Sequence, residues 1–233
     1  MHSVEREARA RIPLTDTLDR SFRLLLVLAL ALIARAATAQ SRWTLSDSAG
    51  KRASPSWSGG VEAYQYFLGA DSYLVLIAGA DHRALHLEER FQYEALRTAS
   101  TWLGWTRTFG KRPRFDVVPM AGVLLGDATG GAVGFEATIS WTAFQLYDEA
   151  EYVFFARGGE ANLLYNWFTG AWHATPWLDL GLSVQRTRTV GTSLVVDRGA
   201  FAAMSRGAVT LTVYGFGLVT GSSFAILALG IEY

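Results

Sequence analysis

The sequence contains no cysteine, which excludes disulfide bonds, thiolate metal sites and cysteine nucleophiles. Proline is scarce, with 5 residues in a chain of 233, whereas glycine supplies 23. Neither sign of charge is in excess, because Lys+Arg and Asp+Glu both total 21. A protein that binds nucleic acid is expected to carry a basic surface, and this composition predicts no such partner.

The chain has one long hydrophobic run, LLLVLALALIA at residues 24–34. It is about half the roughly 20 residues that a membrane-spanning helix needs, but it suits the apolar core of a secretory signal. The small residues of 37–39 (Ala-Thr-Ala) follow it, so we expect cleavage before Gln40. An uncleaved signal anchor is the alternative, which Arg35 favours. Because the polar segment before the run is long, the true start codon is also open.

Three segments follow from the composition. Residues 1–39 are the predicted signal peptide, and the Ser-rich residues 40–59 are a predicted flexible periplasmic leader. Residues 60–233 alternate polar and apolar side chains in segments that short turn clusters separate, a spacing typical of an all-β sandwich or barrel. No later apolar run is long enough for a membrane helix, so any membrane must be crossed by strands.

The alternation predicts an antiparallel transmembrane β-barrel of about twelve strands, or ten if residues 60–81 pair poorly. The segments match the roughly nine to eleven residues of a tilted membrane-crossing strand and exceed the roughly five or six of a soluble sandwich. The predicted strands are 60–69, 72–81, 84–96, 100–110, 114–126, 130–142, 144–156, 161–173, 176–188, 194–205, 207–219 and 223–233.

The two faces of each predicted strand differ in polarity. Leu180 and Leu182, for example, alternate with Asp179 and Gly181. An apolar outer row and a polar inner row are the rule in membrane barrels, although a soluble sandwich shows the same period with its faces reversed. The export signal and the strand length favour the barrel. Tryptophans near the predicted strand ends fit interfacial belts: Trp57, Trp141, Trp172 and Trp177.

The sequence ends in AILALGIEY, in which apolar residues alternate up to a terminal aromatic. In this it resembles the outer-membrane β-barrel proteins of Gram-negative bacteria. The resemblance implies location in the cell outer membrane, with membrane lipid and the barrel-assembly machinery as partners. Leu229, Ile231 and Tyr233 match the positions of the assembly signal. It also implies two periplasmic termini and short outward turns, which argue against a plug: 70–71, 97–99, 127–129, 157–160, 189–193 and 220–222.

A twelve-stranded barrel is wider than the eight strands that side chains can just fill. Strand parity predicts these lumen-lining residues: Glu88, Arg90, Gln92, Glu94, Thr106, Glu136, Thr138, Tyr147, Glu149, Glu151, Tyr165, Trp167, Asp179 and Gln185. The acidic excess among them predicts a narrow passive channel for small cationic or neutral solutes. The alternative is a structural or interaction barrel with a closed, polar-packed lumen.

Enzymatic activity is not expected. Beyond the predicted signal peptide the histidines are His82, His86 and His173, which lie beside predicted periplasmic turns or low in a strand. Glu149 and Glu151 are two apart and could suit acid–base work, but a hydrated inner row explains them more simply. The sequence shows no metal-ligand cluster and no phosphate-binding loop, so we predict no metal or cofactor.

Strict parity directs several charges toward lipid: Glu89, Arg107, Asp148, Arg186 and Arg198. An arginine on the lipid face destabilises a barrel by roughly 2–4 kcal/mol at the bilayer midplane and by about 0–1 kcal/mol near the interfaces, and a carboxylate destabilises it less. If the third hairpin turned about Thr98, Glu89 would face Arg107 and Tyr93 would face lipid. This register predicts a Glu89–Arg107 ion pair at the periplasmic rim. A competing hypothesis is that Glu89 and Asp148 mark an interface between protomers.

Overall fold

The computed structural model describes residues 57–157, 161–217 and 223–233. The predicted signal peptide and nearly all of the predicted leader lie outside these residues, so both stay predictions. No helix in the described part of the chain is long and apolar enough to cross a membrane. The strands, in contrast, follow one another along almost the whole described chain, as the alternating sequence predicts.

All strand pairings are antiparallel. The strands are β1 (Ser58–Leu68), β2 (Asp71–His82), β3 (Leu85–Phe91), β4 (Thr98–Trp105), β5 (Arg107–Gly110), β6 (Arg114–Gly126), β7 (Thr129–Trp141), β8 (Phe144–Arg157), β9 (Leu163–Thr175), β10 (Leu178–Thr189), β11 (Val195–Arg206), β12 (Val209–Phe216) and β13 (Phe224–Glu232).

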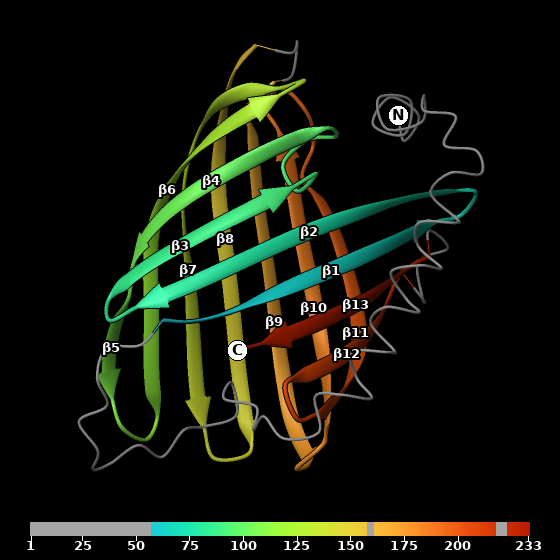
Figure 1. The fold of residues 1–233 in the computed structure, drawn as a ribbon. Helices are drawn as coiled ribbons and strands as arrows, with labels where there is room; N and C mark the ends of the chain where they lie inside the picture. The colour runs from blue at the N-terminus through green and yellow to red at the C-terminus, as the bar shows by residue number, and fades with distance from the viewer. Residues whose placement is uncertain (1–56, 158–160, 218–222) are drawn as a thin grey trace. The chain divides into compact units, whose positions relative to one another are not determined.

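The sheet closes on itself (Figure 1). Each strand pairs with its neighbour in sequence except β4 and β5, which both pair with β6, and β1 also pairs with β13. Since β4 and β5 keep one register on β6, they are two halves of a single strand, and the thirteen elements form a closed barrel of twelve strands. The prediction of twelve is confirmed. The alternative of ten is wrong, because β1 and β2 pair along their length and complete the ring.

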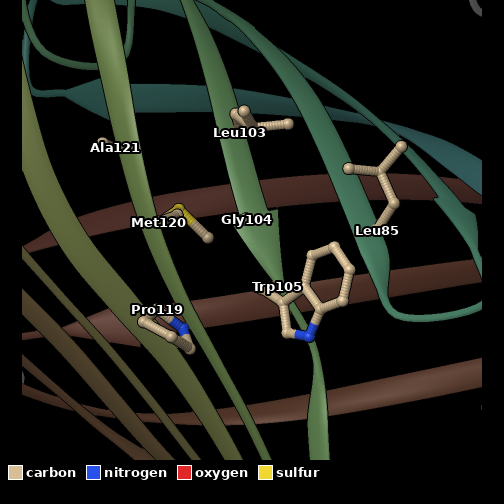
Figure 2. Close-up of a pocket in the computed structure, with 7 residues that line it drawn as sticks. All are labelled: Leu85, Leu103, Gly104, Trp105, Pro119, Met120 and Ala121. Carbon is tan, nitrogen blue, oxygen red and sulfur yellow. The ribbon is translucent and has the colours of Figure 1, made fainter.

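A proline explains the break between β4 and β5. The common register puts Pro119 of β6 opposite Trp105, and proline has no backbone N–H for the ladder. Thr106 donates its N–H to the carbonyl of Ala84 instead, at 2.7 Å. An apolar surface groove of about 440 Å³ marks this place (Figure 2). Its lining includes Leu85, Leu103 and Trp105.

The third hairpin differs from the prediction. The strand predicted over 84–96 ends at Phe91, and the turn comprises residues 92–97 instead of 97–99. Gln92 and Arg97 bound this turn, with φ of 60° and 52°. Left-handed backbone at non-glycine residues is uncommon, so this turn could not be predicted from the residue pattern. The backbone N–H of Gln92 donates to the carbonyl of Thr98 at 2.8 Å and closes the turn.

This turn overturns the predicted Glu89–Arg107 ion pair. Glu89 lies opposite Thr101 on β4 and Ala78 on β2, six positions along the strand from Arg107. That separation is roughly 20 Å, beyond the reach of the two side chains. The guanidinium of Arg107 instead lies over the ring of Trp105, 5.7 Å from its centroid.

The outer wall is apolar, as expected of a surface in contact with lipid. Its large exposed side chains include Leu103, Leu125 and Leu182, which are 57–69% exposed. We call the end where β1 begins and β13 finishes the near end, and the opposite end the far end. Three of the predicted belt tryptophans lie at the near ends of β7, β9 and β10 and are about half exposed: Trp141, Trp172 and Trp177.

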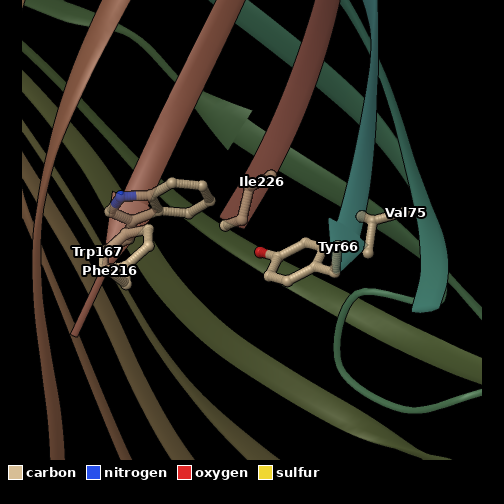
Figure 3. Packing of buried hydrophobic residues seen from close by; sticks show 5 residues of the cluster. All are labelled: Tyr66, Val75, Trp167, Phe216 and Ile226. Atoms are coloured by element: carbon tan, nitrogen blue, oxygen red, sulfur yellow. The ribbon is translucent and has the colours of Figure 1, made fainter. Parts of the chain in front are cut away.

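Buried side chains gather on the inner face in two clusters. One includes Tyr66, Val75, Trp167, Phe216 and Ile226 (Figure 3). The second is built on Trp102, Met120, Leu124, Ala132 and Val153. The first cluster combines residues of strands that lie on different sides of the ring, from β2 to β9, whereas the second comes from the consecutive strands β4, β6, β7 and β8.

A charged constriction in the barrel lumen

Arg90 of β3 reaches into the lumen and is surrounded by carboxylates. Its Nη1 lies 2.8 Å from Glu149 Oε1 and 2.9 Å from Glu151 Oε2, and its Nε contacts Glu88. Glu136 Oε1 is 3.9 Å from Nη2. The Arg90 side chain is 1% exposed, so these ion pairs lie away from bulk water. One guanidinium therefore faces four carboxylates.

The ion pairs cross the barrel. Glu149 and Glu151 belong to β8, which three intervening strands (β4, β6 and β7) separate from β3 in the sheet order. Arg90 also lies over the rings of Tyr93 and Trp102, 4.6 and 4.7 Å from their centroids. Cation–π contacts of this kind are worth about 0.5–2 kcal/mol each. The arginine thus joins two parts of the wall that lie a third of the ring apart. We call Arg90 and the four carboxylates around it, those of Glu88, Glu136, Glu149 and Glu151, the constriction.

The turn of residues 92–97 fills space beside the constriction. The Tyr93 hydroxyl donates to Glu149 Oε2 at 3.0 Å, and the Tyr93 ring meets Tyr165 edge-on at 5.6 Å. Glu94 Oε1 accepts hydrogen bonds from Ser100 Oγ at 2.6 Å and from Trp102 Nε1 at 3.1 Å. The prediction that Tyr93 faces lipid is therefore wrong. The expectation that short turns leave the lumen without a plug is also wrong, since this turn folds inward.

Aromatic rings close the other side of the lumen. Trp167 of β9 packs against Tyr64 of β1 and Tyr214 of β12, with centroid distances of 5.7 and 5.4 Å. The Trp167 indole N–H donates to Ser183 Oγ at 2.7 Å, so its polar atom is satisfied. Trp167 is 5% exposed and Trp102 is 0% exposed. The middle of the lumen is filled in this conformation.

Toward the near end the inner face is partly exposed and acidic. Asp81, Glu136 and Asp179 have side-chain exposures of 20–30%. His86 and His173 each lie beside an aspartate, with Nδ1 2.9 Å from Asp81 Oδ1 and 2.8 Å from Asp179 Oδ1. Strand register also turns inward Glu62, Glu88, Asp116, Glu149, Glu151, Asp197 and Glu232. Among the side chains that the structure describes, the inward guanidinium groups belong to Arg90 and Arg114.

The predicted lumen residues divide into groups by position. Glu88, Arg90, Glu136, Glu149 and Glu151 meet in the constriction. The turn carries Gln92 and Glu94, and Gln92 donates to the carbonyl of Leu74 at 2.8 Å. Thr106 lies in the β4–β5 break. Residues elsewhere on the inner face are Thr138, Tyr147, Tyr165, Trp167, Asp179 and Gln185.

Sequence reasoning left out several inner residues. The hydroxyl of Tyr64 donates to Glu62, and both belong to an inner row of β1 that parity alone could have identified. Asp81 follows from the same argument on β2. Tyr93 could not be found this way, because the backbone leaves the strand at Gln92 and parity no longer applies beyond it.

No protein-family model and no curated protein sequence matches the chain. Solved structures do match its fold. The KdgM porin superposes with a TM-score of 0.55 over 75% of this chain and 99% of that one, at 8% identity. A second structure of the KdgM porin, in complex with disordered oligogalacturonate, gives a TM-score of 0.54 at 7% identity, over 76% of this chain and 98% of that one. The chain has the fold of outer-membrane β-barrel proteins. At this identity the likeness extends to the fold alone, so function must be argued from the lumen.

Proposed function

We propose that the protein is a narrow outer-membrane channel that favours small cations and neutral solutes. The observation that supports this function best is the constriction, where one arginine, Arg90, faces four carboxylates: those of Glu88, Glu136, Glu149 and Glu151. Rings of carboxylates attract cations and repel anions, most strongly where low-dielectric walls exclude water. The acidic near end adds to the same field.

Carboxylate oxygens without a hydrogen-bond donor, in and beside the constriction, support a cationic solute. Glu94 Oε2 and Glu151 Oε1 are buried and accept no hydrogen bond from the protein. Buried carboxylate oxygens are normally satisfied, so an excess of acceptors favours a solute that brings positive charge or donors. The oligogalacturonate bound by the KdgM porin is a polyanion, which this lumen would repel. We therefore expect the two barrels to differ in the charge of their solutes.

Passage requires the filled middle of the lumen to open. The turn of residues 92–97 is the element to move, because it is short and reaches the middle of the lumen through two side chains, those of Tyr93 and Glu94. At its end Arg97 is paired with Asp127 on the far rim, where both side chains are more than half exposed. Exposed ion pairs contribute about 0–1 kcal/mol to stability, so the Arg97–Asp127 pair holds the turn only weakly.

The competing candidate is a structural barrel that never conducts. The observation in its favour is the burial of Arg90, Trp102 and Trp167, which fill the lumen at mid-height. Conductance of the purified protein in planar bilayers separates the two. We expect small steps in potassium chloride for the wild type and larger steps for Tyr93→Ala, which removes the ring beneath Arg90. Currents equal to those of protein-free bilayers for both proteins would favour the structural barrel.

Charge selectivity has its own test. Glu136→Gln removes the most exposed carboxylate of the constriction, whose oxygen is 3.9 Å from Arg90. We expect the reversal potential in a potassium chloride gradient to shift toward zero, because cation preference weakens. Asp71→Asn, which changes an exposed carboxylate at the tip of β2, is the control and should leave the reversal potential unchanged. A wild-type reversal potential of anionic sign would contradict the proposed preference.

A further inference from the structure

Three arginines project from the outer wall near the far end. They are Arg186 and Arg188 of β10 and Arg198 of β11, and all three are exposed. Arg186 and Arg188 share one face of their strand, roughly 7 Å apart. Arg198 lies opposite Val184, which makes it a diagonal neighbour of Arg186, also about 7–8 Å away. We call these residues the arginine patch.

The upper end of the patch lies at an interface of the membrane. A tilted strand rises roughly 2.5 Å per residue along the bilayer normal. Arg188 follows Leu178, at the near end of β10, by ten residues. Arg188 therefore lies about 25 Å above the near-end belt, which is about the full height of the apolar band of such barrels. By the same rise Arg186 lies about 20 Å above the belt, and Arg198, opposite Val184, about 15 Å above it. Headgroups, rather than acyl chains, surround Arg188 at that height, and the long side chains of Arg186 and Arg198 can extend from the wall toward the same level.

Two of the three arginines of the patch carry positive charge that no described carboxylate neutralises. Arg186 Nη1 donates to Asn166 Oδ1 at 2.6 Å, and Asn166 Nδ2 donates to Asp148 Oδ1 at 2.5 Å. These two consecutive hydrogen bonds orient the Arg186 side chain and give the outward Asp148 carboxylate a donor. Arg188 and Arg198, in contrast, form no ion pair with any side chain that the structure describes.

We propose that the arginine patch binds the phosphate of a membrane lipid headgroup at the far end of the barrel. The planar guanidinium fork matches two phosphate oxygens. Arg188 and Arg198 start about 14 Å apart on the two sides of Arg186, so their side chains would extend toward each other to hold one headgroup. The exposed Val190 and Leu194, at the turn that joins β10 to β11, offer apolar contact beside it. The site is on the outer wall, so it is independent of any activity of the lumen.

The test uses the purified full-length barrel in neutral detergent and native mass spectrometry. Phosphatidylglycerol and phosphatidylcholine with identical acyl chains are titrated separately. We expect preferential retention of phosphatidylglycerol, with about a fivefold loss of affinity per arginine removed, so roughly 25-fold for Arg188→Gln/Arg198→Gln. Arg107→Gln is the control. It removes another outward arginine, near the opposite end, and should change the affinity less than twofold.

Three outcomes would overturn the proposal: equal retention of the two lipids by the wild type, unchanged affinity in the double variant, and displacement of the lipid by equimolar inorganic phosphate. The last would show a site for free anions only. Heat-modifiable gel migration of each variant confirms that the barrel has folded. If the double variant does not fold, the single variant Arg198→Gln is measured instead, with an expected fivefold loss.

Discussion

Replacing Arg90 with methionine should destabilise the barrel more than any other single charge deletion. Arg90 forms ion pairs with Glu149 and Glu151 at 2.8 and 2.9 Å, and its side chain is 1% exposed. Removing one partner of a buried ion pair costs about 3–5 kcal/mol, because the remaining charges are left buried without compensation. Methionine has a similar length and leaves no large cavity, so the loss reports electrostatics more than packing.

The assay is equilibrium unfolding by urea of the barrel in lipid vesicles, followed by tryptophan fluorescence. We expect the free energy of unfolding of Arg90→Met to fall by about 3–5 kcal/mol. Arg107→Met is the matched control. Its guanidinium is on the outer wall and contacts one ring, Trp105, so its loss should stay below about 1 kcal/mol.

A double-mutant cycle separates the ion pair from the general loss of a large side chain. In a Glu151→Gln background, Arg90→Met should cost less, because one fewer buried carboxylate is left unpaired. Groups in direct contact typically show coupling energies of about 0.5–3 kcal/mol. A loss below 1 kcal/mol for Arg90→Met, or additive losses in the cycle, would refute the argument that Arg90 neutralises the constriction.

Two further substitutions test the packing of the lumen. In Gly122→Ala the new Cβ would lie 2.6 Å from the ring of Trp102, and we expect a loss of about 1–3 kcal/mol in the same unfolding assay. Gly131→Ala is its control, since the nearest atom there is 3.7 Å away, and an equal loss in both variants would contradict this reading. In Tyr93→Phe the hydroxyl that donates to Glu149 at 3.0 Å is lost while the ring stays. We expect more frequent channel opening in planar bilayers, and opening statistics equal to those of the wild type would exclude a role for this hydrogen bond in closure.

The strands could be predicted because two solvents act on each of them. Lipid outside and a polar interior impose a period of two along every strand, so the sequence alternates wherever the wall is regular. The segment predicted over 114–126 coincides with β6, the one predicted over 130–142 is shifted by one residue from β7, and the one predicted over 144–156 ends one residue before β8 does. The same alternation identifies the inner face, including Glu88 and Arg90.

Contacts across the lumen could not be predicted from the same pattern. Arg90 and Glu151 are 61 residues apart, and parity says only that both point inward. Which inner residues meet depends on the register of every strand between them, and each register is fixed by a turn. One misplaced turn, at residues 92–97, was enough to give β4 the wrong partners along its whole length and to turn Tyr93 toward lipid.

The error over Glu89 shows what a charge on the outer wall does and does not require. The predicted pair with Arg107 rested on the idea that opposite charges on a lipid-facing wall must meet. In the structure Glu89 is exposed between Ala78 and Thr101, whereas Asp148 is held by the amide of Asn166. Placing a carboxylate against lipid costs less free energy than placing an arginine there. A hydrogen bond from the Asn166 amide is therefore enough for Asp148, and Glu89 is tolerated without an arginine partner. Depth and local hydrogen bonding, rather than pairing of opposite signs, therefore govern these positions. The same reasoning accounts for Arg188 at the far interface, where the free-energy cost of an outward arginine is lowest.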